Sequence, residues 1–139
     1  MKKLLFLLAF AVCAKAGFSQ TSVTPIPEKS APAVVAIAAF ASQNYDFGKI
    51  KQGVPVTHEF KFTNKGTVPM VITAVQASCG CTTPSYTSDP IPPQGQGFIK
   101  ATFNAAAAGG FNKTVTVTAN VESGFVQLAI RGEVVAAVQ

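Results

Sequence analysis

The sequence predicts an all-β protein, an antiparallel sandwich of about seven short strands. Apolar and polar residues alternate in several segments, and turn-forming residues separate these segments at intervals of about eight to twelve positions. No segment has a convincing helical period. With 139 residues, 48% of them hydrophobic and 12% charged, the chain has the size and composition of one folded domain rather than of a disordered protein.

The alternation is clearest in residues 54–63. Val56, His58, Phe60 and Phe62 share one face and are expected to be buried, while the polar residues between them face water. Other strands are expected at residues 34–40, 45–50, 68–77, 98–104, 111–120 and 125–135. The proline-rich residues 84–96 are expected to form a loop, and Gly48 indicates a bulge or bend. Because there is no room for crossover helices, the strands are expected to pair antiparallel.

The first 16 residues have the features of a secretion signal. Lys2 and Lys3 precede an apolar run, Leu4 to Val12, which is too short to cross a bilayer because a crossing helix needs about 20 residues. Residues 14–16 have the small-x-small pattern of a cleavage site. We therefore expect cleavage after Ala16, with Gln20 as the alternative site.

Three regions follow from this pattern: a signal peptide at residues 1–16, a proline-punctuated linker at residues 17–33, and a sandwich domain at residues 34–139. The mature protein is expected to be periplasmic or secreted. A lipid anchor on Cys13 is not expected, because valine directly before that cysteine does not fit the small residue that lipidation requires.

The net charge of +5 arises mostly from the signal, since Lys2, Lys3 and Lys15 leave with it and the mature charge becomes +2. The remaining lysines are scattered, so nucleic acid is not an expected partner. No second apolar segment has the length of a transmembrane helix. Another protein of the cell envelope is the expected partner.

Cys79 and Cys81 are the two cysteines that remain after cleavage. In an extended chain their side chains share a face and their Cα atoms lie about 6.5–7 Å apart, the outer limit for a disulfide, although Gly80 allows a bend that shortens this distance. Three interpretations stay open: a local disulfide or buried thiol pair, a soft-metal site, or a redox-active pair prone to exchange. A disulfide here would close a very small loop and contribute little stability.

A metal site would need further ligands. Cu(I) accepts two thiolates with His58 or Met70, so Cys79, Cys81 and His58 form the candidate copper site. The alternative for His58 is a neutral, hydrogen-bonded imidazole on the core face of its strand, and the alternative for Met70 is ordinary packing. Structural zinc would want four ligands, and the mature chain has no second cysteine pair.

Three segments together resemble a known family: Asp46 to Ile50 with Gly53, Phe60 to Gly66, and Ser78 to Thr82. In this order and spacing, over residues 36–134, the chain is similar to the bacterial family named domain of unknown function 1573. The Cys-Gly-Cys-Thr element is the most specific of the three. The resemblance implies an immunoglobulin-like β-sandwich in an exported protein, and it implies no catalytic activity.

No arrangement of residues predicts an active site, since the acidic residues are scattered and phosphate-binding loops are absent. We therefore expect a non-catalytic binding or scaffold module of the bacterial cell envelope, in which an unpaired strand edge offers pairing to a partner chain. The alternative is a periplasmic copper-binding or thiol-redox protein that uses Cys79 and Cys81.

Overall fold

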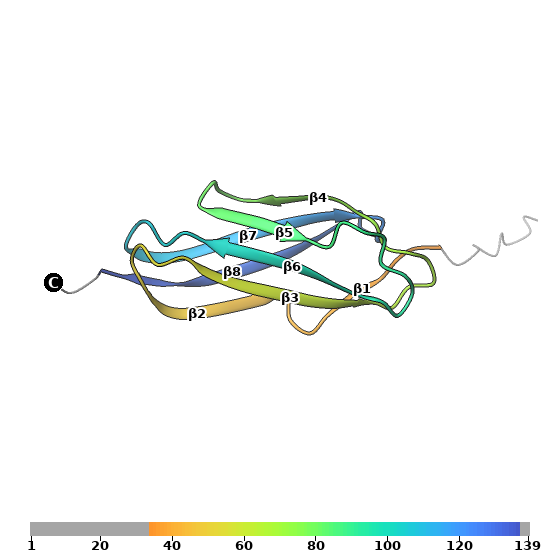
Figure 1. Ribbon diagram of the computed structural model, residues 1–139, viewed down its shortest axis with the longest axis horizontal. Coiled ribbons are helices and arrows are strands. Elements are labelled where there is room, and N and C mark those ends of the chain that lie inside the picture. The colour runs from red at the N-terminus through yellow and green to blue at the C-terminus, as the bar shows by residue number, and fades with distance from the viewer. Residues whose placement is uncertain (1–33, 137–139) are drawn as a thin grey trace, which may run out of the picture. The chain divides into compact units, whose positions relative to one another are not determined.

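The computed structural model describes residues 34–136, which form two β-sheets packed face to face (Figure 1). The predicted signal peptide and linker lie outside the described residues. Eight strands make up the two layers: β1 (Ala38–Phe40), β2 (Asn44–Lys51), β3 (Val56–Asn64), β4 (Ile72–Ala77), β5 (Thr82–Tyr86), β6 (Gln96–Phe103), β7 (Gly109–Ala119) and β8 (Phe125–Val135).

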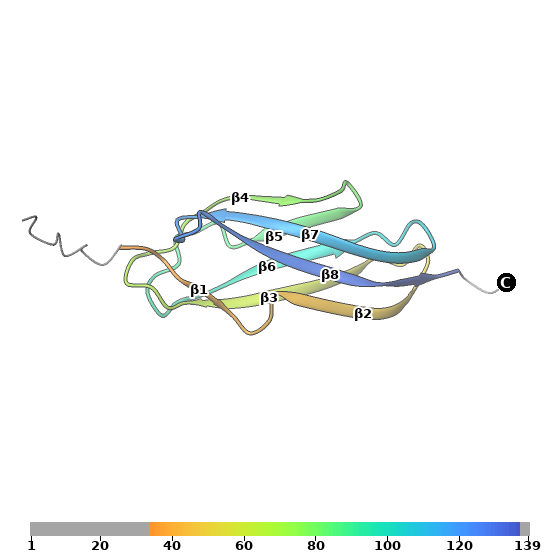
Figure 2. The same cartoon turned by 180° about the vertical axis from the view of Figure 1, so that it is seen from behind.

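One sheet has the strand order β1-β3-β6-β5 and the other β2-β8-β7-β4. The reverse view in Figure 2 shows β8 lying between β2 and β7 in the second sheet. The predicted immunoglobulin-like sandwich is confirmed. The expectation of purely antiparallel pairing is wrong in one place, because β2 pairs with β8 in parallel. A parallel pair needs a long connection between its strands, and here the rest of the domain supplies it in place of a helix.

A second correction concerns β5, which lies where a loop was expected. Its residues Thr82–Tyr86 pair antiparallel with β6, and Pro84 sits opposite Ala101. β5 is an edge strand, and an edge strand tolerates proline because the lost N–H donor can face away from the ladder. The strand expected at residues 68–77 is also shorter than predicted, since β4 begins at Ile72.

The core lies between the two sheets and is built from aliphatic and phenylalanine side chains. The alternation predicted for residues 54–63 is visible in β3, where Phe60 and Phe62 are each 3% exposed. β7 and β8 contribute buried residues from their inward faces, including Val115, Val117 and Leu128. No tryptophan is present to fill the core, so the packing depends on many smaller contacts.

Asn64, at the end of β3, is fully buried and is held by four hydrogen bonds. Its Nδ2 donates to the carbonyl oxygens of Val68 (2.7 Å) and Ile91 (2.9 Å). Its Oδ1 accepts from the backbone N–H groups of Gly66 (2.9 Å) and Ile37 (3.3 Å). One side chain therefore joins the first strand region, the turn after β3 and the loop before β6.

Gly66 is required by the same junction. A Cβ atom at this position would lie 2.6 Å from the carbonyl oxygen of Val35 and 2.7 Å from Cα of Ala36. Real Cβ atoms do not approach a backbone so closely. Only glycine therefore allows the turn after β3 to lie against the backbone that leads into β1. The segment Phe60 to Gly66 thus combines buried aromatic residues, a buried amide and a close backbone approach.

The Asn64→Asp variant tests the importance of this amide. The change keeps the shape but removes both donated hydrogen bonds and places a carboxylate beside two carbonyl oxygens. We expect the free energy of unfolding, measured by urea titration, to fall by about 3 kcal/mol or more. The control is Asn112→Asp on the exposed face of β7, for which a change within about 0.5 kcal/mol is expected. Equal effects for the two variants would contradict the assignment.

Candidate functional sites

The Cys-Gly-Cys segment forms the turn that carries the chain from β4 in one sheet to β5 in the other. Cys79 and Cys81 are joined in a disulfide, and their Cα atoms are 5.3 Å apart. This separation is shorter than in an extended strand because the chain turns at Gly80. Both cysteines are half-buried, and Gly80 between them is exposed.

His58 and Met70 do not join the cysteines. His58 pairs across β3 and β6 with Ala101, which in turn pairs with Pro84, so β6 separates His58 from β5. Met70 is fully buried in the core. Within residues 34–136 no group of three His, Cys, Asp or Glu side chains lies close enough to hold a metal ion. The structure therefore does not assemble the copper site predicted from Cys79, Cys81 and His58.

Aromatic rings surround His58 instead. Its imidazole stacks on Tyr45 of β2, with ring centroids 3.5 Å apart, and contacts the edge of Phe60 at 4.5 Å. This cluster closes the side of the sandwich where β2 and β3 meet. Burial disfavours the charged imidazolium and lowers the pKa of His58 below its ordinary value of 6.5, although the Glu59 carboxylate opposes the shift.

A shallow apolar dent of about 220 Å³ lies beside Cys81. The stacked rings of Phe103 and Phe111, 4.0 Å apart, form part of its wall. Small residues line the rest, from Ala106 to Gly110, and Lys113 also reaches the dent. Residues 104–108, which include this alanine-rich segment, form a loop between β6 and β7.

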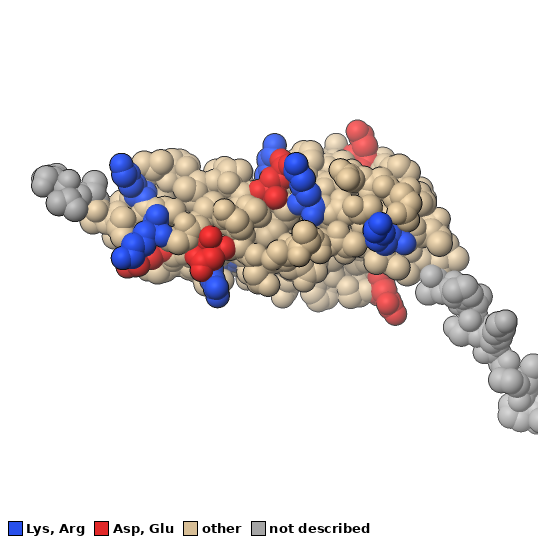
Figure 3. Space-filling view, turned by 90° about the horizontal axis from the view of Figure 1, so that it is seen from below, with Lys and Arg blue, Asp and Glu red and all other residues tan. Residues whose placement is uncertain are grey.

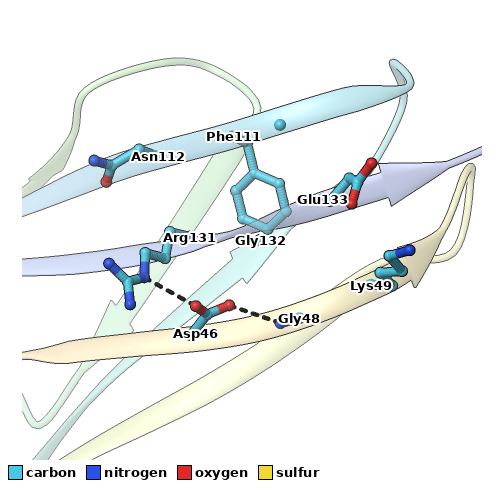
Figure 4. Close-up of a pocket in the computed structure, with 9 residues that line it drawn as sticks. Asp46, Gly48, Lys49, Phe111, Asn112, Arg131, Gly132 and Glu133 are labelled. Atoms are coloured by element: carbon cyan, nitrogen blue, oxygen red, sulfur yellow. Dashed lines mark hydrogen bonds and ion pairs between the residues drawn. The ribbon is translucent and has the colours of Figure 1, made fainter.

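An open hollow of about 550 Å³, with charged side chains at its border, lies on the outer face of β2, β8 and β7 (Figure 4). The Asp46 carboxylate accepts from the Gly48 N–H at 2.8 Å and from Arg131 Nε at 3.0 Å. The Gly48 hydrogen bond, followed by Arg131, holds the pKa of Asp46 below its ordinary value. Gly48 has φ of 65° and lies in the predicted bulge, so Asp46 and Gly48 together form a turn that shapes the strand. Two acidic and two basic residues line the hollow, so it has no net charge that would attract an anion or a cation.

The four sheet edges differ in how they are protected against pairing with another chain. β1 has only three residues, β2 carries three charged residues and a bulge, and β5 contains Pro84. Each of these features disfavours strand addition. β4 is six residues long and contains no charged residue and no proline, although a register shift lies between Ile72 and Ala74. It is therefore the least protected of the four edges in residues 34–136.

Charge is distributed unevenly around the molecule. On the side that carries β2 and β3, basic and acidic groups are interspersed (Figure 3), and Glu59 forms ion pairs with Lys100 at 3.2 Å and Lys61 at 3.6 Å. In contrast, residues 66–88, which include β4 and β5, contain no charged residue. The β4–β5 side is thus built from a neutral stretch of chain.

The two-layer topology, in which the consecutive strands β1 and β2 belong to different sheets, defines an immunoglobulin-like β-sandwich, of which PapD-like domains are examples. The chain belongs to the family described as protein of unknown function (DUF1573), whose model matches residues 38–134. No curated protein sequence matches the chain.

Solved structures resemble this fold at low sequence identity. A protein of unknown function from Porphyromonas gingivalis W83 has a TM-score of 0.65 at 14% identity, covering 78% of this chain, and this chain spans about half (51%) of that protein. The ASH/PapD-like domain 7 of human CEP192 has a TM-score of 0.64 at 11% identity, covering 84% of this chain and 98% of the domain. The secreted serine protease VesC from Vibrio cholerae has a TM-score of 0.55 at 11% identity, covering 77% of this chain and 24% of VesC.

Removal of the disulfide tests its structural weight. Because the closed loop has three residues, the bond constrains the unfolded chain little, and the Cys79→Ser/Cys81→Ser double variant is expected to lose about 1.5 kcal/mol of unfolding free energy. Urea titration monitored by circular dichroism measures the loss. Failure of the double variant to fold would show that the bond is essential to the sandwich.

The titration of His58 tests its burial. Because the folded-state pKa lies below the unfolded value, the unfolded chain binds a proton first as the pH falls. The contribution of His58 is therefore fully present above pH 6.5 and is lost as the pH falls through the folded-state pKa. His58 is the one histidine of the chain, so a single imidazole NMR resonance should titrate below 6.5. The Tyr45→Ala variant, which uncovers the ring, should raise its midpoint, and an unchanged midpoint would contradict this explanation.

Proposed function

We propose that the protein is an exported, non-catalytic binding module of the bacterial cell envelope, and that it binds by pairing β4 with an extended segment of another protein chain. The β4 edge, the least protected of the four, is the observation that carries this proposal. An edge strand presents unpaired N–H and C=O groups, and strand addition satisfies both sets while it extends the sheet.

The neutral surface around β4 indicates the chemistry of the partner segment. By its register with Thr118 and Thr116, β4 directs Ala74 and Gln76 to the outer face and Val75 to the core face. A charged side chain brought onto this surface would lose water without gaining an opposite charge in residues 66–88. The fitting partner is therefore an uncharged strand of about five or six residues, the length of a typical strand.

The comparisons support a modular role without naming a partner. The likeness to a complete PapD-like domain of CEP192 and to a quarter of VesC means that this fold occurs as one unit within larger proteins. Export is supported by the amino-terminal pattern of basic, apolar and small residues. In residues 34–136 no helix could cross a membrane.

Site-specific photo-cross-linking tests this function. A photoreactive amino acid at Gln76 on β4 should give one discrete protein adduct in intact cells, recovered with the envelope fraction and identified by mass spectrometry. The same amino acid at Gln96, on the central strand β6 of the other sheet, is the matched control and should give none. Ala74→Lys, which adds a charge to the edge, should reduce the Gln76 adduct at least about tenfold. Adducts of equal yield at both positions, or an adduct unaffected by Ala74→Lys, would exclude binding through β4.

A further inference from the structure

The Cys79–Cys81 disulfide lies in the turn between β4 and β5. Both cysteines are half-buried, Cys81 packs against the edge of the core, and Gly80 between them is exposed. A Cβ atom built on Gly80 would meet nothing within 4 Å, so the space above the disulfide turn is open. Access to sulfur is one of the conditions that determine the rate of thiol–disulfide exchange.

Hydrogen bonds also hold both ends of the turn, in addition to the disulfide. The Ser78 N–H donates to the Thr114 carbonyl at 2.8 Å, and the Thr114 N–H donates to Ser78 Oγ at 3.1 Å, so the end of β4 is tied to β7. On the other side, the Asn104 N–H donates to the Cys81 carbonyl at 3.0 Å. None of these bonds involves a sulfur atom, so we expect both ends of the turn to stay anchored after reduction.

The two sulfur atoms have different surroundings. Cys79 Sγ lies 3.8 Å from Oγ1 of Thr82, a hydroxyl on a residue that is only 4% exposed. A hydroxyl at this distance can donate to a thiolate, and such a bond stabilises the charged form. Cys81 instead lines the apolar dent, together with Phe111 and Lys113. In a thiol–disulfide exchange, these surroundings favour Cys79 as the sulfur that leaves and Cys81, next to the recess, as the sulfur that is attacked.

We propose that Cys79–Cys81 is a thiol–disulfide exchange site that takes a dithiol of a protein or peptide as its substrate. The substrate thiolate attacks Cys81 Sγ, the bond between the two protein sulfurs breaks, and Cys79 leaves as a thiolate that accepts the Thr82 hydroxyl hydrogen bond. The second substrate thiolate then attacks the substrate sulfur of the mixed disulfide, and Cys81 leaves. The substrate loses two electrons and two protons and becomes a disulfide, and Cys79 and Cys81 gain them as two thiols.

The dent indicates which dithiols fit. Its floor of alanine and glycine residues between Phe103 and Phe111 accommodates a small apolar side chain next to the attacking cysteine. Lys113 also lines the recess, and its positive charge favours an incoming thiolate. The recess lies at the turn that follows β4, yet exchange does not depend on strand pairing there.

The reduction rate of the folded protein is the first test. The purified oxidised protein is treated with dithiothreitol in native buffer and in guanidinium chloride, and free thiols are trapped by alkylation and counted by mass spectrometry. For an open exchange site, the native rate is expected within about tenfold of the unfolded rate, with an unchanged circular dichroism spectrum after reduction. A slower native rate, or loss of the β spectrum on reduction, would overturn the proposal, because the disulfide would then be a protected structural bond.

The second test asks which sulfur is attacked. After brief exposure to reduced glutathione and alkylation, peptide mapping is expected to find glutathione on Cys81 and the alkyl group on Cys79, and the reverse pattern or an equal mixture would overturn the assignment.

Thr82→Val should slow exchange about tenfold, whereas Thr82→Ser should restore it and the exposed neighbour Thr83→Val should leave it unchanged. Equal rates for Thr82→Val and Thr83→Val would remove Thr82 from the mechanism. Ala74→Lys, which tests strand pairing, is expected to leave exchange unchanged, so the two proposals can fail separately.

Discussion

Asn64 makes four hydrogen bonds at a place from which water is excluded, and three regions of the chain meet on its amide. A buried amide is costly unless each of its groups is paired, and here the Nδ2 donors and the Oδ1 acceptor all have partners. No hydrophobic residue could satisfy the same backbone groups. The packing of the two sheets therefore requires the polar junction at the end of β3 to form together with the apolar core.

Two of the three segments that predicted the family resemblance have a structural explanation. Asp46 and Gly48 build the bulge that shapes β2, and Asn64 and Gly66 build the junction with β1. The third segment differs, because the turn at Cys79 to Cys81 is already anchored by backbone hydrogen bonds and its disulfide closes a loop of three residues. Such a small loop constrains the unfolded chain little, so support of the fold alone gives this disulfide a weak structural explanation.

Charge is distributed differently over the two sides of the molecule. Ion pairs and the Asp46–Arg131 pair keep the β2 and β3 side polar and well solvated. Residues 66–88, which include β4 and β5, contain no charged residue. β4 also lacks the proline, the charged side chains and the very short length that protect the other edges. Natural sandwiches usually protect such edges because their unpaired N–H and C=O groups can pair with another chain. The least protected edge is therefore where such pairing meets the fewest obstacles.

Side-chain alternation is a local property, and for that reason it predicted most of the strands. β3, β7 and β8 each pack one face against the core, so their pattern of period two was visible in residues 56–64, 109–119 and 125–135. β5 was missed because Pro84 is permitted only by the position of the strand at an edge, which local sequence does not reveal. The copper site was a candidate because Cu(I) accepts two thiolates together with a histidine, but β6 lies between His58 and the cysteine turn.

The sequence by itself determined the fold class, the position of the Gly48 bulge and the proximity of Cys79 to Cys81, because each depends on neighbours within a few residues. Only the tertiary structure decided the parallel pairing of β2 with β8, the four partners of Asn64 and the exposure of β4. These features join residues that are far apart in the chain. Their geometry follows from how the two sheets pack, and no local pattern of side chains encodes that packing.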